Sequence, residues 1–366
     1  MKILYGVQGT GNGHITRARA MVSAFRNHPD TQVDFLFSGR ERNKYFDMEP
    51  FGQWQSYGGL TFLHKSGKVA PFATLKHNSI SRLLCDIRNL DVSQYDLIIT
   101  DFEPITAWAG KWAQKTVIGV GHQYAFHHAI PKKGDNWLAE AIMRHFATVN
   151  LGIGLHWHHF GAPILPPIAD TPPQTNGVIE NKILVYLGFE DPAKVQAMLE
   201  PISGYQFTYY GEFEAAKAEG NIQYRPLSRE GFKQDLATAN GVICNAGFEL
   251  ASEALDLGKK LLVKPLYGQM EQLSNAEALA QLGLGKVMNT LSTDAVQEWL
   301  ENQPNVTMHY PNVAGAIVNW IHQGVWTEES LTDLASELWG EVRTNHGEDF
   351  AQLQRLEEFK LKAFGS

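Results

Sequence analysis

The chain has 366 residues, of which 44% are hydrophobic and 19% charged, and its formal net charge is −8. This length and composition are typical of a soluble globular protein with two domains of about 150–200 residues each. The acidic balance argues against nucleic acid as the main partner, and the two cysteines, Cys85 and Cys244, do not suggest a disulfide framework.

Strand and helix patterns alternate along the first half of the chain. Apolar runs predict strands at residues 3–7, 33–37, 60–63, 97–100, 117–120 and 149–153. Helical spacing falls between them at residues 15–27, 80–89, 105–114 and 137–146. Because such alternation is typical of α/β proteins, we predict a first Rossmann-like domain over residues 1–162.

A proline-rich stretch follows this domain. Residues 163–177 contain five prolines, cannot hold a helix or a central strand, and are predicted to be the interdomain linker. Strands then recur at 183–187, 206–209, 222–224, 242–244 and 261–263, which predicts a second Rossmann-like domain over 178–326. The charged helical patterns of residues 327–366 can cross back to the first domain. Two such domains place their carboxyl edges across one cleft, where ligands bind.

The segment 245–276 combines features of a phosphate site and of a polyol site. Gly247 permits a turn between a buried strand and a helix over residues 248–257. The free N–H groups and the dipole at that helix N-terminus favour a phosphate. Glu253, about one turn inside the helix, can accept hydrogen bonds from vicinal sugar hydroxyls. Further hydroxyl partners follow in Glu271, Gln272 and Asn275. Together these features predict a nucleotide-sugar site.

The loop after the first strand is glycine-rich and ends in His14. A dinucleotide fingerprint would need glycine at this position and an acidic residue closing the second strand, where Arg40 stands instead, and the Walker pattern is absent. A histidine at the cleft fits a general base, because its pKa of about 6.5 leaves it mostly neutral at cellular pH. The alternative is a passive His14 that caps the helix or binds a phosphate.

Asp101 ends the strand at 97–100 and can fix the tautomer of such a base. The alternative is that Asp101 caps the helix that starts near Pro104, and Glu103 is the second candidate carboxylate. Other residues at this edge are expected to line the acceptor pocket: Gly11, Asn12, Gly13, Glu103, His122, His127 and His158. No carboxylate or cysteine lies at ligand spacing from the histidines, so no metal is expected.

Residues 64–88 place five basic side chains among apolar ones, with a single acidic residue. Such a surface in an acidic protein fits contact with anionic lipid or with an acceptor pyrophosphate, and a solvated helix face explains it equally well. No apolar run approaches the length of a membrane span, and the chain enters its first strand without a signal peptide. We therefore expect a cytoplasmic protein, and peripheral contact with the inner face of the membrane through 64–88 stays open.

The residues of both sites resemble those of GT-B glycosyltransferases, and the resemblance covers nearly all of the chain. It is strongest to the bacterial enzyme that adds N-acetylglucosamine to the peptidoglycan lipid intermediate, and to the glucuronosyl- and glucosyltransferases. Three segments carry it: the glycine loop at 9–14, the segment 101–108 and the donor segment 245–276. The resemblance implies two Rossmann-like domains facing across a cleft.

By this resemblance His14 is the base and Asp101 its partner, and Gly247 and Phe248 lie at the diphosphate. Glu253 is implied to bind the ribose hydroxyls. Glu271 and Gln272 are implied to bind the transferred sugar, and the remaining donor residues are Arg225, Leu227, Ser228, Asn245, Glu249 and Asn275.

Two features of the chain depart from the family pattern. Residues 188–190 stand where the family often has a phosphate loop. Asn245 replaces both the basic residue often found beside the phosphate and the first glutamate of the retaining signature, and we therefore favour inversion.

We expect a metal-independent, cofactor-free transfer of a sugar from a UDP-sugar to a hydroxyl acceptor. Two alternatives share the architecture: a nucleotide-sugar epimerase or hydrolase, which needs no acceptor, and a non-catalytic nucleotide-sugar-binding protein. The sequence identifies neither the sugar nor the acceptor, and a lipid-linked acceptor stays open.

Overall fold

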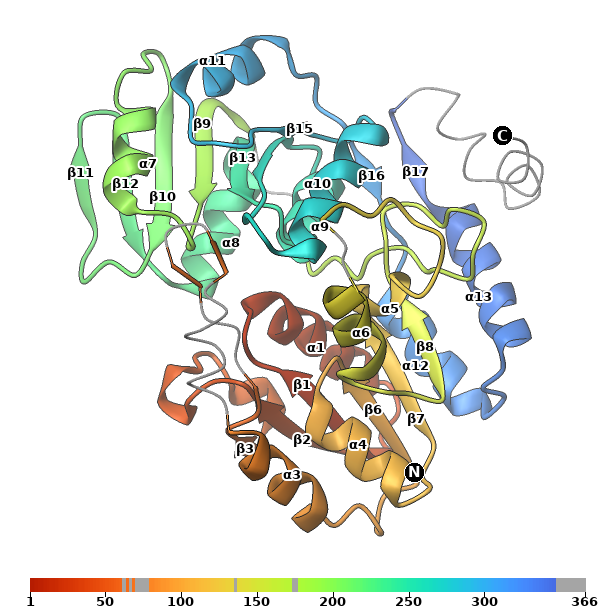
Figure 1. Ribbon diagram of the computed structural model, residues 1–366. Helices are drawn as coiled ribbons and strands as arrows, with labels where there is room; N and C mark the ends of the chain where they lie inside the picture. Colours follow the sequence, from red (N-terminus) through yellow and green to blue (C-terminus); the bar gives the residue numbers. More distant parts are fainter. Residues whose placement is uncertain (61–63, 66–67, 70–78, 135–136, 173–176, 347–366) are drawn as a thin grey trace.

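A computed structural model describes residues 1–60, 64–65, 68–69, 79–134, 137–172 and 177–346. The chain forms two α/β units, each built on a mainly parallel sheet, and two helices that follow the second unit lie against the first (Figure 1).

The first sheet contains six parallel strands in the order β3-β2-β1-β6-β7-β8. The strands are β1 Lys2–Gln8, β2 Gln32–Ser38, β3 Trp54–Tyr57, β6 Leu97–Asp101, β7 Val117–Gly121 and β8 Leu151–Gly154. The helices of this unit are α1 Asn12–Phe25, α3 Ile80–Asn89, α4 Pro104–Trp112, α5 His122–Ala125 and α6 Trp137–His145. Short elements complete it: η1 Arg42–Lys44, η2 Glu49–Phe51, β4 His64–Lys65 and β5 Lys68–Val69.

The period of two along β1 explains why helices cover both faces of this sheet. Ile3 and Tyr5 point toward α1, whereas Leu4 packs with residues of α3 and α4. The edge strand β3 at 54–57 was not predicted. The strand predicted at 60–63 falls, apart from residue 60, outside the described residues.

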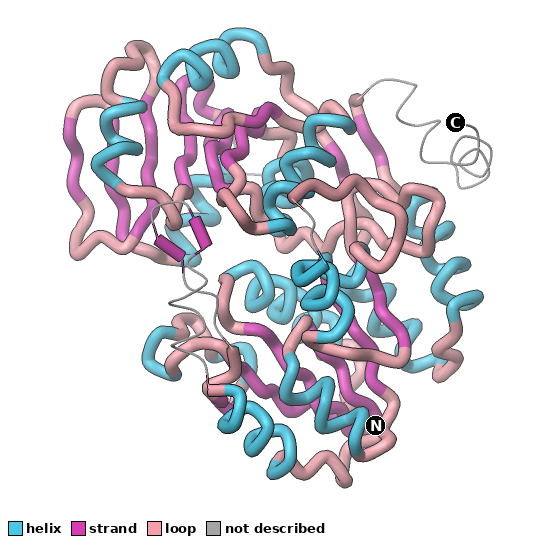
Figure 2. The backbone as a smooth tube through the Cα atoms, in the orientation of Figure 1, coloured by secondary structure: helices cyan, strands magenta, loops and turns pink. Residues whose placement is uncertain are grey.

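The second sheet has seven strands in the order β11-β12-β10-β9-β13-β14-β15, and only β11 runs antiparallel to its neighbour. The strands are β9 Ile179–Tyr186, β10 Gln206–Gly211, β11 Lys217–Glu219, β12 Ile222–Pro226, β13 Ala239–Asn245, β14 Lys260–Lys264 and β15 Lys286–Val287. The helices are α7 Pro192–Leu199, α8 Arg229–Thr238, α9 Phe248–Asp256, α10 Met270–Gln281 and α11 Thr293–Asn302 (Figure 2).

The chain returns to the first unit through α12 Val313–Gln323 and α13 Glu328–Glu341, with β16 Met308–His309 pairing β17 Arg343–Thr344. The return begins before residue 327, because α12 already packs against α1, where the Thr31 hydroxyl donates to His322 Nε2 at 2.6 Å. In α13, the Trp339 indole donates to the carbonyl of Ile164 at 2.7 Å. The predicted helical pattern at 350–364 lies outside the described residues.

Among the described residues, no helix combines the length and the apolar character that crossing a membrane would require.

Candidate active site between the domains

Two helix N-termini meet where the carboxyl edges of the two sheets face each other. α1 follows β1 and α9 follows β13, and the two helices are in contact. Their N-cap residues, Gly11 and Gly247, supply no side-chain cap, and a Cβ atom at either position would meet nothing within 4 Å. No N-cap side chain bonds the first-turn N–H groups of either helix, and together with the helix dipoles these groups favour an anion.

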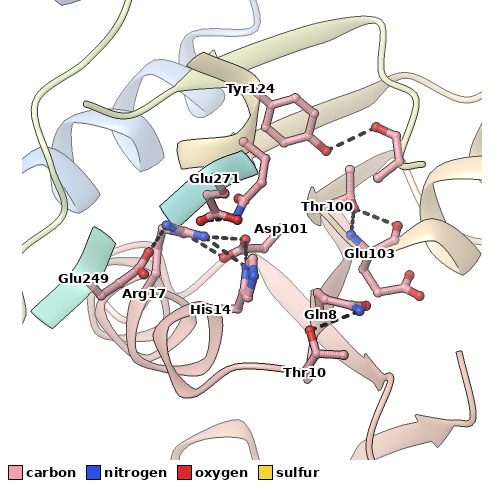
Figure 3. Close-up of polar contacts among 12 residues, drawn as sticks. Gln8, Thr10, His14, Arg17, Thr100, Asp101, Glu103, Tyr124, Glu249 and Glu271 are labelled. Carbon is pink, nitrogen blue, oxygen red and sulfur yellow. Dashed lines mark hydrogen bonds and ion pairs between the residues drawn. The ribbon is translucent and has the colours of Figure 1, made fainter. Parts of the chain in front are cut away.

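His14, in the first turn of α1, contacts Asp101 at the end of β6. The Nδ1 atom of His14 lies 2.7 Å from Asp101 Oδ1 (Figure 3). The Asp101 side chain is fully buried, whereas that of His14 is 14% exposed. Because Nδ1 donates to the carboxylate, Nε2 is the nitrogen left to accept a proton.

The two partners shift each other's pKa toward the charged forms. Burial lowers the pKa of His14, but attraction to Asp101 and the hydrogen bond to it outweigh burial, so the pKa lies above 6.5. Burial raises the pKa of Asp101, but Arg17 and His14 outweigh it, so the pKa lies below 3.8. Asp101 is therefore ionised at neutral pH.

The turn after β6 separates the two candidate carboxylates. Phe102 adopts a φ of 51°, which is unusual for a bulky residue. Beyond this turn Glu103, and not Asp101, caps α4, because its carboxylate accepts from the Ile105 and Thr106 N–H groups. Glu103 is fully buried, and burial raises its pKa despite these hydrogen bonds. Among the described residues, Glu103 does not form the hydrogen bond to His14 that Asp101 forms.

Arg17 completes this part of the site, although the sequence analysis did not single it out. Its Nε lies 2.8 Å from Asp101 Oδ2, its Nη2 lies 2.6 Å from Asp101 Oδ1, and its Nη1 pairs with Glu249 of α9. The side chain is 1% exposed. The available signal was its position three residues after His14, which places both side chains on one face of α1.

On the second domain, Glu253 of α9 is a buried carboxylate. Lys233 Nζ lies 3.7 Å from Glu253 Oε1. It forms a closer ion pair, at 2.7 Å, with Asp170 in the predicted linker. Burial therefore outweighs the attraction of Lys233 and raises the pKa of Glu253 to about 7. Among the described residues, Glu253 Oε1 has no hydrogen-bond partner.

The ends of β13 and β14 hold a second group that the sequence analysis only partly anticipated. Lys264 pairs with Glu190 at 2.7 Å, and both side chains are buried. The Asn245 amide donates to the carbonyl of Lys264 at 3.1 Å and to Glu190 at 3.4 Å. Asn245 Oδ1 is buried and has no hydrogen-bond partner within the described part of the chain. A lysine thus stands beside the position where Asn245 replaces the basic residue.

The remaining predicted donor residues divide into two groups. Arg225 and Leu227 are exposed at the end of β12, and Ser228 caps α8 by accepting from the Gly231 N–H at 3.2 Å. On α10, Gln272 Oε1 accepts from the Leu266 N–H at 3.0 Å, and Glu271 accepts from Gln123 of the first domain at 3.1 Å.

His122 does not line an open pocket, because it lies buried in the contact between the domains. Its Nδ1 lies 2.8 Å from the Leu155 carbonyl and its Nε2 2.6 Å from Asn275 Oδ1. Its ring stacks on Phe248 of α9 with a centroid distance of 4.0 Å and an interplanar angle of 4°. The Phe248 side chain is therefore occupied in the contact between the domains.

The other predicted acceptor residues lie in different places. Asn12 reaches the second domain, with Nδ2 3.4 Å from the Tyr186 hydroxyl, and Gly13 packs against Glu249. His127 is exposed and hydrogen-bonded to the Met143 carbonyl. His158 is buried beside Trp339 of α13, so it is not brought together with His14. Within the described ranges, no group of three or more His, Cys, Asp or Glu side chains is arranged to hold a metal ion.

Two Rossmann-like domains with a site between their carboxyl edges form the architecture of the GT-B glycosyltransferases. A family model described as glycosyl transferase family 1 matches residues 1–304, and the chain belongs to this family. The predictions of a GT-B fold and of a glycosyltransferase are thereby confirmed. A search of curated protein sequences finds no match.

Solved glycosyltransferases share the fold at low sequence identity. The glycosyltransferase of kitacinnamycin aligns with a TM-score of 0.57 and 13% identity over 98% of both chains. SnogD from Streptomyces nogalater aligns with a TM-score of 0.51 and 15% identity over 96% of this chain and 98% of its own. The spinosyn rhamnosyltransferase SpnG, complexed with thymidine diphosphate, aligns with a TM-score of 0.54 and 13% identity over 93% of this chain and 96% of its own.

Proposed function

We propose that this glycosyltransferase moves a sugar from a pyrimidine nucleoside diphosphate donor to a hydroxyl acceptor, with inversion at the anomeric carbon and without a metal. The observation that carries the proposal is the His14–Asp101 pair, 2.7 Å apart, beside the uncapped N-termini of α1 and α9. One helix end can receive the leaving diphosphate while the histidine activates the acceptor.

The donor-binding assignment is supported by buried acceptor atoms that lack partners. Asn245 Oδ1 and Glu253 Oε1 are both buried and without a hydrogen bond among the described residues, which suits hydroxyl groups of a bound donor. We assign the ribose hydroxyls to Glu253 and the transferred sugar to Glu271 and Gln272. The exposed segment from Arg225 to Ser228 would flank the base. SpnG, with the same fold, carries thymidine diphosphate, so UDP and dTDP are both donor nucleotides to be tested.

The chemical step follows from the orientation of His14. Nε2 takes the proton of the acceptor hydroxyl while Asp101 stabilises the resulting imidazolium. The acceptor oxygen forms a bond to the anomeric carbon on one face, and the bond from that carbon to the diphosphate oxygen breaks on the other. The electron pair leaves with the nucleoside diphosphate, whose charge the N-terminus of α9 stabilises. Contact between the domains excludes water and limits hydrolysis of the donor.

The proposal for the acceptor includes contact of the first domain with a membrane. On α3, Ile80 and Leu84 are 60% and 43% exposed, and Arg82 and Arg88 are exposed beside them. Apolar and basic side chains on one helix support peripheral contact with anionic lipid, and with it a lipid-linked acceptor at the cytoplasmic face. Residues 66–67 and 70–78 of the 64–88 segment lie outside the described residues. Flotation with anionic vesicles tests the contact: binding that Arg82→Glu/Arg88→Glu abolishes supports it, and no binding contradicts it.

The activity is tested by a thermal-shift screen of UDP- and dTDP-sugars, followed by trials of hydroxyl acceptors with the best donor. The expected result is a glycoside of inverted anomeric configuration and free nucleoside diphosphate, formed only when an acceptor is present. NMR of a reaction with the donor alone separates the alternatives. An epimerised sugar favours an epimerase and a free sugar favours a hydrolase. A product of retained configuration contradicts inversion.

A further inference from the structure

Arg17 is a buried cation that both domains share. It lies in α1, and its guanidinium binds both carboxylate oxygens of Asp101, at 2.8 and 2.6 Å. Its remaining terminal nitrogen pairs with Glu249, which lies in the first turn of α9 in the second domain. One side chain therefore joins Asp101, the partner of the proposed base, to the helix whose N-terminus faces the proposed diphosphate site (Figure 3).

The rigid geometry of the guanidinium suits this arrangement. Arg17 is 1% exposed and Asp101 fully buried, so both charges are shielded from water and depend on each other. Nη2 of Arg17 lies 3.1 Å from His14 Nδ1, so the same group that holds Asp101 also borders the imidazole. A lysine at this position would retain the charge but could not span three oxygens in a fixed plane.

The charges around His14 come from three elements. Asp101 comes from β6, Arg17 from the same helix as His14, and Glu249 from α9. With a neutral imidazole these groups sum to a charge of about −1, and with an imidazolium to about zero. Burial lowers the pKa of His14 and Asp101 raises it most among the charged groups, while Arg17 lowers it and Glu249 raises it. The contribution of Glu249 exists only when the second domain is in place.

We infer that Arg17 is a positioning residue for the Asp101–His14 pair, and that Glu249 supplies the contact through which the donor-binding domain completes it. The inference rests on the proposed function, because it assigns His14 the role of base. It implies that His14 is most basic only when the donor-binding domain is packed against the first domain. His14 then deprotonates the acceptor hydroxyl in the same domain arrangement that binds the donor.

The alternative to this inference is that the Arg17–Glu249 pair only holds the two domains together. Another ion pair between the domains provides the control. Lys133, in the loop after α5, pairs with Glu277 of α10 at 2.8 Å, and both side chains are more exposed than those of the buried pair. Glu277→Gln removes an interdomain charge contact without touching His14, Arg17 or Asp101. Glu249→Gln keeps an oxygen that can accept from Arg17, so it removes the charge and little else.

The experiment measures the pKa of His14 in the full-length protein by NMR of the imidazole nitrogens, without any substrate. The chain has 14 histidines, and the His14 signal is the one that His14→Asn removes. Glu249→Gln is expected to lower the pKa of His14 by about half a pH unit or more, because one nearby negative charge is lost. Glu277→Gln is expected to leave it at the wild-type value. An unchanged or higher pKa in Glu249→Gln, or an equal change in Glu277→Gln, overturns the inference.

Kinetics separate this inference from the proposed function. The acidic limb of the kcat/KM profile should move to lower pH in Glu249→Gln by the same amount as the NMR pKa. Arg17→Lys should lower kcat by about a hundredfold, through misplacement of the pair, with a small change in KM. If His14→Asn retains turnover, the proposed base fails. If His14→Asn is inactive while the profile of Glu249→Gln equals that of the wild type, only the link through Glu249 fails.

Discussion

Gly13 of α1 faces Glu249 of α9 so closely that a Cβ atom on residue 13 would overlap the Glu249 carboxyl group. The absence of a side chain at Gly13 thus leaves room for the Glu249 carboxyl group, within reach of Arg17.

Gly13→Ala is therefore expected to displace Glu249 and lower turnover by about tenfold or more, since small misplacements at an active site are costly. Alanine favours a helix over glycine by about 1 kcal/mol, so α1 itself should not be weakened. Gly340→Ala is the matched control, because Gly340 lies in α13 with nothing within 4 Å of its Cβ position. Turnover and the thermal midpoint are measured for both variants. Wild-type turnover in Gly13→Ala would show that the close approach has no role in catalysis.

Replacing His14 tests the proposed base directly. His14→Ala should reduce turnover at least about a hundredfold, the usual contribution of a positioned general base. Binding of UDP or dTDP, measured by calorimetry, should remain close to that of the wild type, because the donor-binding groups assigned above lie in the second domain. Turnover near the wild-type level would refute the assignment, and a parallel loss of nucleotide binding would point to a phosphate-binding role for His14.

The pH dependence of the reaction should report the same residue. His14 must be neutral to accept a proton, and its pKa lies above 6.5 because Asp101 outweighs the effect of burial. We expect kcat/KM to rise with pH through this raised pKa. In Asp101→Asn the attraction is lost, so the rise of kcat/KM should occur at lower pH, while the maximal kcat/KM falls. A rise at the same pH as in the wild type would show that a group other than His14 controls it.

The sequence predicted the sheet elements well where apolar runs are buried on both faces, as in residues 242–244 of β13, all of which are buried. It missed the edge strand β3, which reads Trp-Gln-Ser-Tyr and has neither a continuous apolar run nor strict alternation. Likewise, nothing local distinguishes Asp101 from Glu103 before Pro104. The positive φ of Phe102 decides which carboxylate enters the site and which caps α4.

Residues at the contact between the domains were harder to predict. His122 follows a strand and was expected at an acceptor pocket, but its burial arises from α9 and α10 of the other domain. Arg17 depends in the same way on Asp101 and Glu249, which are 84 and 232 residues away. Such contacts depend on how two complete domains dock, and no periodicity of the chain encodes that arrangement.

Glu253 should affect both donor binding and stability. Loss of its carboxylate in Glu253→Gln should weaken nucleotide binding by about 1.5–3 kcal/mol, the usual range for a hydrogen bond to a charged group. Calorimetry with UDP and dTDP measures this change, and Glu277→Gln, which alters a carboxylate outside the proposed donor site, serves as control. Unchanged affinity in Glu253→Gln would remove the ribose assignment.

The same carboxylate should make stability depend on pH. Its folded-state pKa is about 7 against an ordinary value of 4.5, so the folded protein holds the proton more tightly. The stabilising contribution is complete below pH 4.5 and is lost as the pH rises through about 7. Relative to Glu253→Gln, the wild type should therefore lose up to about 3 kcal/mol over this window. Urea unfolding at several pH values measures the difference, and parallel curves for the two proteins would contradict the prediction.

His122 should contribute to the stability of the domain contact and not to acceptor binding. Its ring is fully buried between Phe248 and the partners Leu155 and Asn275, and burial lowers its pKa. His122→Ala leaves a cavity and strands hydrogen-bonding groups, and it should lower the unfolding free energy by about 3 kcal/mol.

The control is His127→Ala, because His127 is exposed and its loss should change stability by less than about 0.5 kcal/mol. Urea unfolding of both variants without substrate measures the effect, since a residue that only lines an acceptor pocket would contribute nothing to stability under these conditions. A His122→Ala protein as stable as the wild type would support the acceptor-site role of His122. A large loss with the donor affinity of the folded protein retained would place it in the contact that holds the two domains together.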